Sequence, residues 1–176
     1  DSVSGLKSIY FINFDDIDSD NVTYNATDTD VIDSWEPTSA LSIYKYELKS
    51  TANSFTTSIN SSRDNGTTFF EQTLVANLKR QDFATHKNVK LLAYGRPRII
   101  VRTMTDQFFL MGLDQGADVS AGEISTGAAL GDFNGYSLTF TAQEELPANF
   151  INVATEAALA TAFADGAGTD AVIVTS

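Results

Sequence analysis

Alternating apolar and polar side chains mark two long segments of the chain as β-strands. Within residues 68–78, every second side chain from Phe70 to Leu78 lies on one mainly apolar face, and the intervening side chains lie on the other. Residues 136–144 repeat this arrangement, with aromatic and aliphatic side chains on one face and hydroxyl and amide side chains opposite. A period of two residues is that of a strand whose faces have different surroundings. Both segments are therefore predicted to be strands with one buried face.

Six shorter apolar segments extend the β pattern. Residues 6–14 are a nearly continuous apolar run, which is typical of a strand buried on both faces. The others are separated by turn residues and predict two hairpins and a terminal strand. These five segments are residues 40–48, 54–60, 98–104, 107–113 and 171–175. We expect residues 50–53 to form the turn of the first hairpin, and Thr105-Asp106 to form that of the second.

A change of period after the long strand predicts the principal helix. In residues 82–94, Phe83, Val89 and Leu92 recur at helical spacing and are expected to face the core. Residues 153–164 are rich in Ala, a strong helix former, and predict a second, shorter helix.

Three segments are expected to lie outside this regular structure. Residues 15–33 carry seven Asp among Ser, Thr and Asn, which favour turns and solvated loops. We interpret residues 15–36 as an extended acidic loop or arm. Residues 114–135 contain five Gly and predict a loop with unusual backbone conformations. Residues 152–176 are interpreted as an appended C-terminal segment.

Length and composition indicate one folded domain. The chain has 176 residues, of which 43% are hydrophobic, enough to bury one core but short for two domains. We predict a single mainly β domain spanning residues 1–176, a β-sandwich or barrel with one flanking α-helix and with extended loop and terminal arms. No apolar run approaches the roughly 20 residues that a membrane span requires, so we expect none.

The charges are distributed unevenly along the chain. The formal net charge is −12, which argues against a nucleic-acid-binding protein, because such proteins present clustered Lys and Arg to phosphates. Residues 1–36 have a net charge of −8 and residues 103–176 have a net charge of −10, with no Lys or Arg in the second of these segments. The intervening residues 37–102 have a net charge of +6.

Seven basic residues between positions 79 and 102 form what we call the basic strip. They are Lys79, Arg80, Lys87, Lys90, Arg96, Arg98 and Arg102. The strip either lies beside acidic segments of the same chain or meets an acidic surface of a second copy. A nucleic-acid groove is a third interpretation, but the strip lacks interleaved stacking aromatics. We predict a subunit interface between the basic strip and the acidic residues Asp15, Asp16, Asp18 and Asp20.

Residues suited to catalysis or metal binding are scarce. The chain has no Cys, and His86 is its only histidine, so a thiol nucleophile and a two-histidine metal site are excluded. Asp16, Asp18 and Asp20 alternate as in a calcium loop, but the Gly and closing Glu of an EF-hand are missing. We therefore predict no enzyme activity, no cofactor and no metal site.

Residues 69–151 resemble small virion structural proteins of tailed bacteriophages, and most of all the tail tube family. The resemblance is carried by the order of the long strand, the helix at 82–94 and three further segments. These segments are RPRIIVRTMTDQFFLMGLDQGADV, the Gly-rich STGAALGDFNGY and YSLTFTAQEELPANFI. In that family a β-sandwich or barrel with one helix forms hexameric rings, the rings stack, and the inner sheets join into a tube.

The resemblance implies a non-enzymatic protein of the phage tail, assembled in the host cytoplasm. Its partners would be further copies of itself and other tail proteins, and DNA would pass through the tube without specific binding. An acidic lumen suits this passage because it repels phosphate, and acids within residues 136–145 or 106–123 would supply the wall.

Two alternatives remain open at the level of sequence. The first is a ring protein of the phage neck, connector or baseplate, which shares the chemistry but does not stack into a tube. The second is a secreted carbohydrate-binding or adhesive β-sandwich, with Trp35, Tyr44 and Tyr46 as exposed stacking aromatics.

Overall fold

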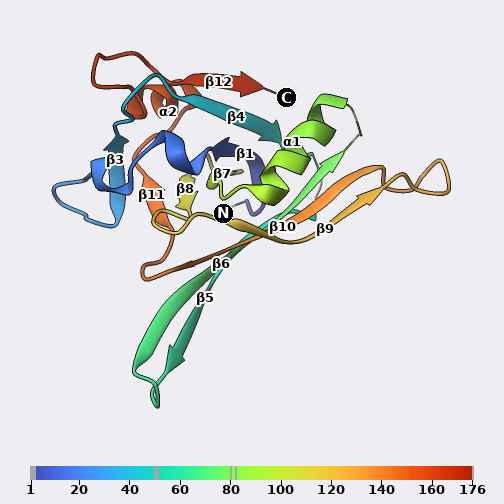
Figure 1. Cartoon of the computed structure of the whole chain (residues 1–176), viewed down its shortest axis with the longest axis horizontal. Coiled ribbons are helices and arrows are strands. Elements are labelled where there is room, and N and C mark those ends of the chain that lie inside the picture. The colour runs from blue at the N-terminus through green and yellow to red at the C-terminus, as the bar shows by residue number, and fades with distance from the viewer. Residues whose placement is uncertain (1–2, 50–51, 80, 82, 176) are drawn as a thin grey trace.

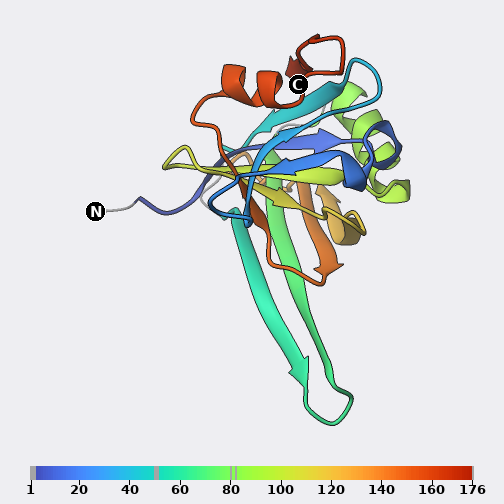
Figure 2. The same ribbon diagram turned by 90° about the vertical axis from the view of Figure 1, so that its left-hand side faces the viewer.

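Strands dominate the fold and are arranged in two sheets. The computed structural model describes residues 3–49, 52–79, 81 and 83–175. Strands account for 46% of the chain and helices for 15%, which confirms the mainly β prediction. The two sheets pack face to face, and a long hairpin extends from the body of the molecule (Figure 1, Figure 2).

The larger sheet has eight strands, and most of its neighbouring pairs are antiparallel. The order across the sheet is β12 (Val172–Thr175), β4 (Ser42–Glu47), β1 (Leu6–Ile12), β7 (Arg98–Thr103), β8 (Phe108–Met111), β11 (Asn149–Ile151), β3 (Val31–Trp35) and β2 (Val22–Tyr24). The two parallel pairs are β12 with β4 and β11 with β3.

The smaller sheet has four antiparallel strands and includes both projections of the molecule. Its order is β5 (Ser54–Ser62), β6 (Thr67–Lys79), β10 (Gly135–Glu144) and β9 (Asp118–Ser125). The β5–β6 hairpin projects at one end of the sheet, and the loop between β9 and β10 projects at the other (Figure 1). Strands β5 and β9 are the two edges of this sheet.

These two edges are offset along the strand direction. Val75 of β6 lies opposite both Ser54 of β5 and Thr139 of β10, and Thr139 lies opposite Ala121 of β9. The first residue of β5 is therefore level with the middle of β9. As a result, β5 runs on toward the hairpin tip, while β9 runs on toward the loop of residues 126–134.

One buried cluster fills the space between the two sheets. Its side chains come from β1, β4 and β7 on one side and from β6 and β10 on the other. Leu74, Ala76 and Leu78 of β6 belong to it, so the face predicted to be buried is buried. The four-stranded sheet is thereby attached to the body through one face only.

A second buried cluster lies on the opposite face of the eight-stranded sheet. It contains Ile43 from one end of the sheet and Ile32 and Trp35 from the other. Because both ends contribute to one cluster, the sheet curls around it. Leu159 and Phe163 from the C-terminal region complete this cluster.

The helix α1 (Phe83–Tyr94) closes one side of the gap between the sheets. It contacts β9, and Asn88 donates a hydrogen bond of 3.0 Å to the hydroxyl of Tyr46 in β4. Thr85 and Val89 are its buried residues. The prediction that Phe83 faces the core is wrong, since 90% of this side chain is exposed.

The sequence predicts most strands but mispairs two of them. Residues 40–48 and 54–60 correspond to β4 and β5, yet β4 belongs to the eight-stranded sheet and β5 to the four-stranded sheet. They therefore do not form a hairpin with each other. The predicted turn at 50–53 falls partly on residues 50 and 51, which lie outside the described residues.

The acidic segment 15–36 is folded, contrary to the prediction of an extended loop. It contains the short 3-10 helices η1 (Phe14–Asp16) and η2 (Ser19–Asn21), followed by β2 and β3. Its apolar residues Ile17, Ile32 and Trp35 are buried, and the Trp35 indole donates a hydrogen bond of 2.6 Å to the Asp18 carbonyl. Burial of these side chains holds the segment against the body.

Two other segments are more ordered than the sequence indicates. Residues 114–135 contain β9, so only part of this Gly-rich segment is a loop. The C-terminal segment 152–176 is built into the fold, because α2 (Glu156–Ala162) contributes Leu159 to the second cluster and β12 extends the larger sheet. The prediction of an appended segment is therefore wrong.

Candidate assembly surfaces

Arg98 of the basic strip is a structural residue of the interior. Only 2% of it is exposed, and its guanidinium donates hydrogen bonds to the carbonyl oxygens of Leu113, Phe14 and Ile17. It also lies over the rings of Phe14 and Trp35, at 4.1 and 4.9 Å. Burial lowers the pKa of Arg98. Arg98 has almost no surface to offer a partner, so its assignment to the interface is withdrawn.

Arg102 is engaged with acids of the same chain. Its guanidinium lies 2.6 Å from the Asp106 carboxylate, which also accepts a hydrogen bond of 3.0 Å from Lys7. Hydrogen bonds from Lys7 and then from Arg102 lower the pKa of Asp106. Glu156 of α2 lies 3.9 Å from Arg102 and 2.6 Å from Lys45. Acids from residues 103–176 therefore neutralise bases from the middle of the chain.

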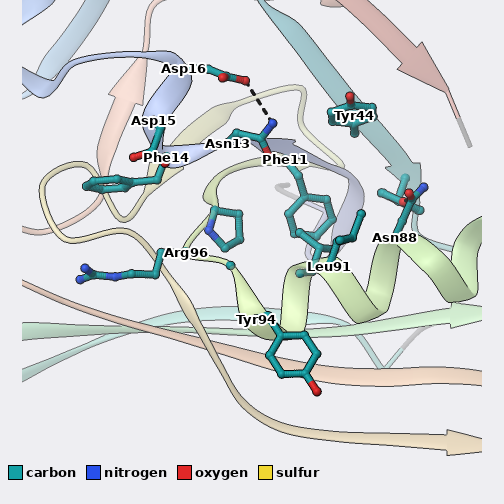
Figure 3. A pocket seen from close by; sticks show the side chains of 14 residues that line it. Phe11, Asn13, Phe14, Asp15, Asp16, Tyr44, Asn88, Leu91, Tyr94 and Arg96 are labelled. Carbon is teal, nitrogen blue, oxygen red and sulfur yellow. Dashed lines mark hydrogen bonds between the residues drawn. The ribbon is translucent and has the colours of Figure 1, made fainter.

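Arg96, Asp15 and Asp16 line one groove of about 710 Å³ (Figure 3). Tyr94 of α1 also lines this groove. Asp16 accepts a hydrogen bond of 3.1 Å from the Asn13 side chain. The fold thus brings predicted partners together within one copy, as the intramolecular interpretation of the charges expects.

The remaining members of the basic strip are dispersed. Lys79 ends β6, and Lys87 and Lys90 are exposed on α1. Arg80 lies outside the described residues. The six described bases therefore do not form one continuous surface, and the interface predicted for the strip stays a prediction for its exposed members alone.

The other predicted acids act mainly within their own segment. Asp18 caps η2 by accepting a hydrogen bond of 3.2 Å from the Asp20 backbone N–H, and both side chains are exposed. Among the described residues, no group of three or more His, Cys, Asp or Glu side chains is placed to hold a metal ion.

The aromatic residues considered for carbohydrate stacking are largely buried. Trp35 is fully buried, Tyr46 is buried in the cluster between the sheets, and Tyr44 is half-buried. Stacking on sugars requires exposed ring faces. These three side chains therefore give the carbohydrate-binding alternative no support.

The outer face of the four-stranded sheet is polar and open to solvent. The register places it on the side of β6 and β10 opposite the core. Hydroxyl and amide side chains predominate on it, among them Thr56, Ser58, Thr73, Asn77, Ser137, Thr139, Thr141 and Gln143. Its acids are Glu71, Asp118 and Glu123, and Lys79 lies at one end.

Glu144 does not belong to this outer face. Its side chain is buried, and it accepts hydrogen bonds of 3.3 and 2.9 Å from the backbone N–H groups of Asp114 and Gln115. Burial raises the pKa of Glu144, although these hydrogen bonds oppose the shift. The expectation that acids of residues 136–145 line a lumen is therefore wrong for Glu144.

Both edges of the same sheet lack a neighbouring strand in the described part of the chain. Most side chains of β5 and β9 are exposed. Such edges present backbone N–H and C=O groups that can pair with another chain. Sequence reasoning missed the edge at β9 because it treated residues 114–135 as a loop.

Comparisons with known proteins identify no relative. No protein-family model matches the chain, and no curated protein or solved structure shows significant similarity to it. Among the described helices, none is long and apolar enough to cross a membrane.

Proposed function

We propose that this protein is a structural component of a tailed-phage virion whose copies form rings that stack into a tail tube. The two open edges of the four-stranded sheet are the observation that carries the proposal. The resemblance stated above adds the expectation of hexameric rings. In this role the protein acts through self-assembly, without catalysis, beside other tail proteins.

Ring formation follows from joining β5 of one copy to β9 of the next. Within one sheet β5 runs antiparallel to β6, β6 to β10, and β10 to β9, so β5 and β9 run in opposite directions. Rotation about an axis along the strands preserves strand direction. The junction between neighbouring copies is therefore antiparallel, and unlike edges meet at every junction, which allows a ring to close.

The outer face of the sheet suits a surface past which DNA slides. Joined sheets would form a wall with their polar faces inward and their apolar faces toward each body. Hydroxyl and amide groups with the acids Glu71, Asp118 and Glu123 offer phosphate little attraction, because affinity for DNA depends on Lys and Arg contacts. DNA would pass without specific binding.

The structure of the basic strip changes the electrostatic part of the hypothesis. Arg98 and Arg102 are engaged within the chain, so backbone pairing takes over as the main source of subunit contact. Lys87, Lys90 and Arg96 remain exposed and available for charge complementarity between copies.

Electron microscopy of the purified protein tests the proposal directly. Tubes of stacked rings are the expected result, with sedimentation velocity giving the mass of the smallest ring. Discrete rings that never stack would favour the neck, connector or baseplate alternative. A protein that stays monomeric at high concentration would overturn the proposal.

A pair of proline variants tests the edge itself. Consecutive residues of a strand direct their N–H groups to opposite sides, so either Thr56 or Thr57 of β5 directs its N–H toward the open edge. Thr56→Pro and Thr57→Pro therefore form a matched pair, in which one variant blocks the edge and the other removes a bond to β6. The variant that keeps the wild-type unfolding midpoint is expected to lose assembly. Normal assembly by that variant would exclude β5 from the junction.

A further inference from the structure

The loop of residues 126–134 forms an ordered apolar projection. The Asp132 carboxylate accepts hydrogen bonds of 2.9 and 2.8 Å from the backbone N–H groups of Ala128 and Ala129. Leu130 is fully exposed in this loop, and Phe133 of the loop and Ile124 near the end of β9 are also exposed. Several exposed apolar side chains on one ordered projection indicate a contact surface, whereas a single exposed apolar side chain does not.

A groove of about 860 Å³ lies at the start of β5. Leu48, Phe55, Met104 and Phe109 provide its apolar walls. The rings of Phe55 and Phe109 lie 6.1 Å apart, and 46% of Met104 is exposed. Lys49 lines the groove and is exposed. The groove therefore combines an apolar lining with a positive charge.

The edge pairing proposed above brings this groove to the loop of a neighbouring copy. Antiparallel pairing over the full length of β9 places Ser54 opposite the neighbour's Ser125, where β9 ends. Beyond that point the neighbour's chain continues into residues 126–134. The chain before Ser54 contributes Asn53 and Lys49 to the groove. The loop and this part of the groove thus lie past the same end of the junction, whereas Phe55 lies opposite the neighbour's Ile124 within it.

The charges of the two surfaces are complementary. The loop of residues 126–134 carries Asp132 and contains no Lys or Arg. Lys49 lies in the groove that would receive the loop. Opposite charges at a contact favour the correct partner and orientation.

We propose that the 126–134 loop of one copy docks in the groove of the next copy, with Leu130 against Met104. This docking rests on the proposed edge pairing, and it buries these side chains beside the junction of β5 with the neighbour's β9. Projection and groove are different surfaces, so each copy uses one of them on each neighbour and the contact is head-to-tail.

Cysteine cross-linking tests the docking because the chain contains no Cys. Leu130→Cys and Met104→Cys are prepared separately, mixed under assembling conditions and oxidised. A disulfide between the two variants is the expected product. The matched control replaces Met104→Cys with Leu91→Cys, a residue of α1 that is also exposed, and should give at least tenfold less cross-linked product.

An assembly measurement complements the cross-link. Leu130→Ser is expected to raise the concentration needed for half-assembly at least tenfold, because it removes a buried leucine from every junction. Leu91→Ser should leave that concentration unchanged. Rings that form normally without the Leu130–Met104 cross-link would overturn the docking while the tube proposal stands. Absence of any wild-type assembly would overturn both.

Discussion

The guanidinium of Arg98 ties the acidic segment and the turn after β8 to the start of β7. Its carbonyl acceptors belong to Phe14, Ile17 and Leu113, which lie in separate segments of the chain. Removing the donor would leave these buried carbonyl oxygens without their partner, a costly state inside a protein. The position of Arg98 in a run of bases gives no sign of this role, because burial depends on segments far away in the sequence.

Arg98→Met is therefore expected to lower the free energy of unfolding by about 3 kcal/mol. Arg96→Met is the matched control, since Arg96 is exposed, and it should change stability by less than about 0.5 kcal/mol. Urea denaturation followed by circular dichroism measures both. Equal stability of the two variants would contradict the structural role of Arg98.

The Glu156 carboxylate is expected to make a pH-dependent contribution to the stability of the fold. Burial acts to raise its pKa, but hydrogen bonds from Lys45 and Tyr10 and the charge of Arg102 together lower it from the ordinary value of 4.5. A carboxylate whose pKa is lowered by folding stabilises the fold at every pH above its ordinary pKa. This contribution is lost as the pH falls through the lowered pKa.

Glu156→Gln should cost about 2 kcal/mol at pH 7, and the difference from wild type should shrink as the pH falls below 4.5. Glu47→Gln is the control, because Glu47 is more exposed and lies 3.9 Å from the same Lys45. Thermal unfolding between pH 3 and 7 gives the comparison. A constant difference across this range would show that the charge of Glu156 does not contribute.

At the scale of elements, the start of β10 depends on a glycine. A Cβ added to Gly135 would lie 2.1 Å from the carbonyl oxygen of Leu78 in β6, so the two strands approach too closely for a side chain. Gly135→Ala is expected to destabilise the protein by about 3 kcal/mol. Gly131→Ala has nothing within 4 Å of the added atom and should be neutral. Guanidinium denaturation of the two variants checks this, and equal midpoints would exclude the close approach.

Elements with a strong local pattern were predictable from the sequence. The strands β6, β7, β8 and β10 were predicted because their alternation or apolar content is itself the signal. Strand β9 contains Ala121, Gly122 and four polar residues, which leave it no continuous apolar face, and it forms because it pairs with β10. In the acidic segment, the seven Asp predicted a solvated loop. The apolar side chains of Ile17, Ile32 and Trp35 are nevertheless buried, and they attach the segment to the body.

At the scale of the whole molecule, folding brings together charges that are separate along the chain. Lys45 and Arg102 from the middle of the sequence meet Asp106 and Glu156 from the acidic segment 103–176. Linear charge segregation is thus partly neutralised within one copy. The candidate assembly surface lies instead at the sheet edges, which a sequence cannot reveal until the order of strands is known.

The offset between the two edges sets the geometry of any closed ring. Ser54 is level with Ala121 of its own sheet, but full edge pairing places it opposite Ser125 of a neighbour, a shift of four residues across four strands. This register shift equals one residue per strand. An eight-stranded barrel of shear eight has the same shift per strand, and its strands tilt by about 36°.

The strands lining such a channel should therefore slant by about 36° from its axis, whatever the number of copies. Helical reconstruction from electron micrographs would measure the slant, and strands upright along the channel would contradict full pairing. A slanted wall also gives the inner surface a screw sense, so material moving through the channel would encounter Glu71, Asp118 and Glu123 along helical tracks instead of in level circles.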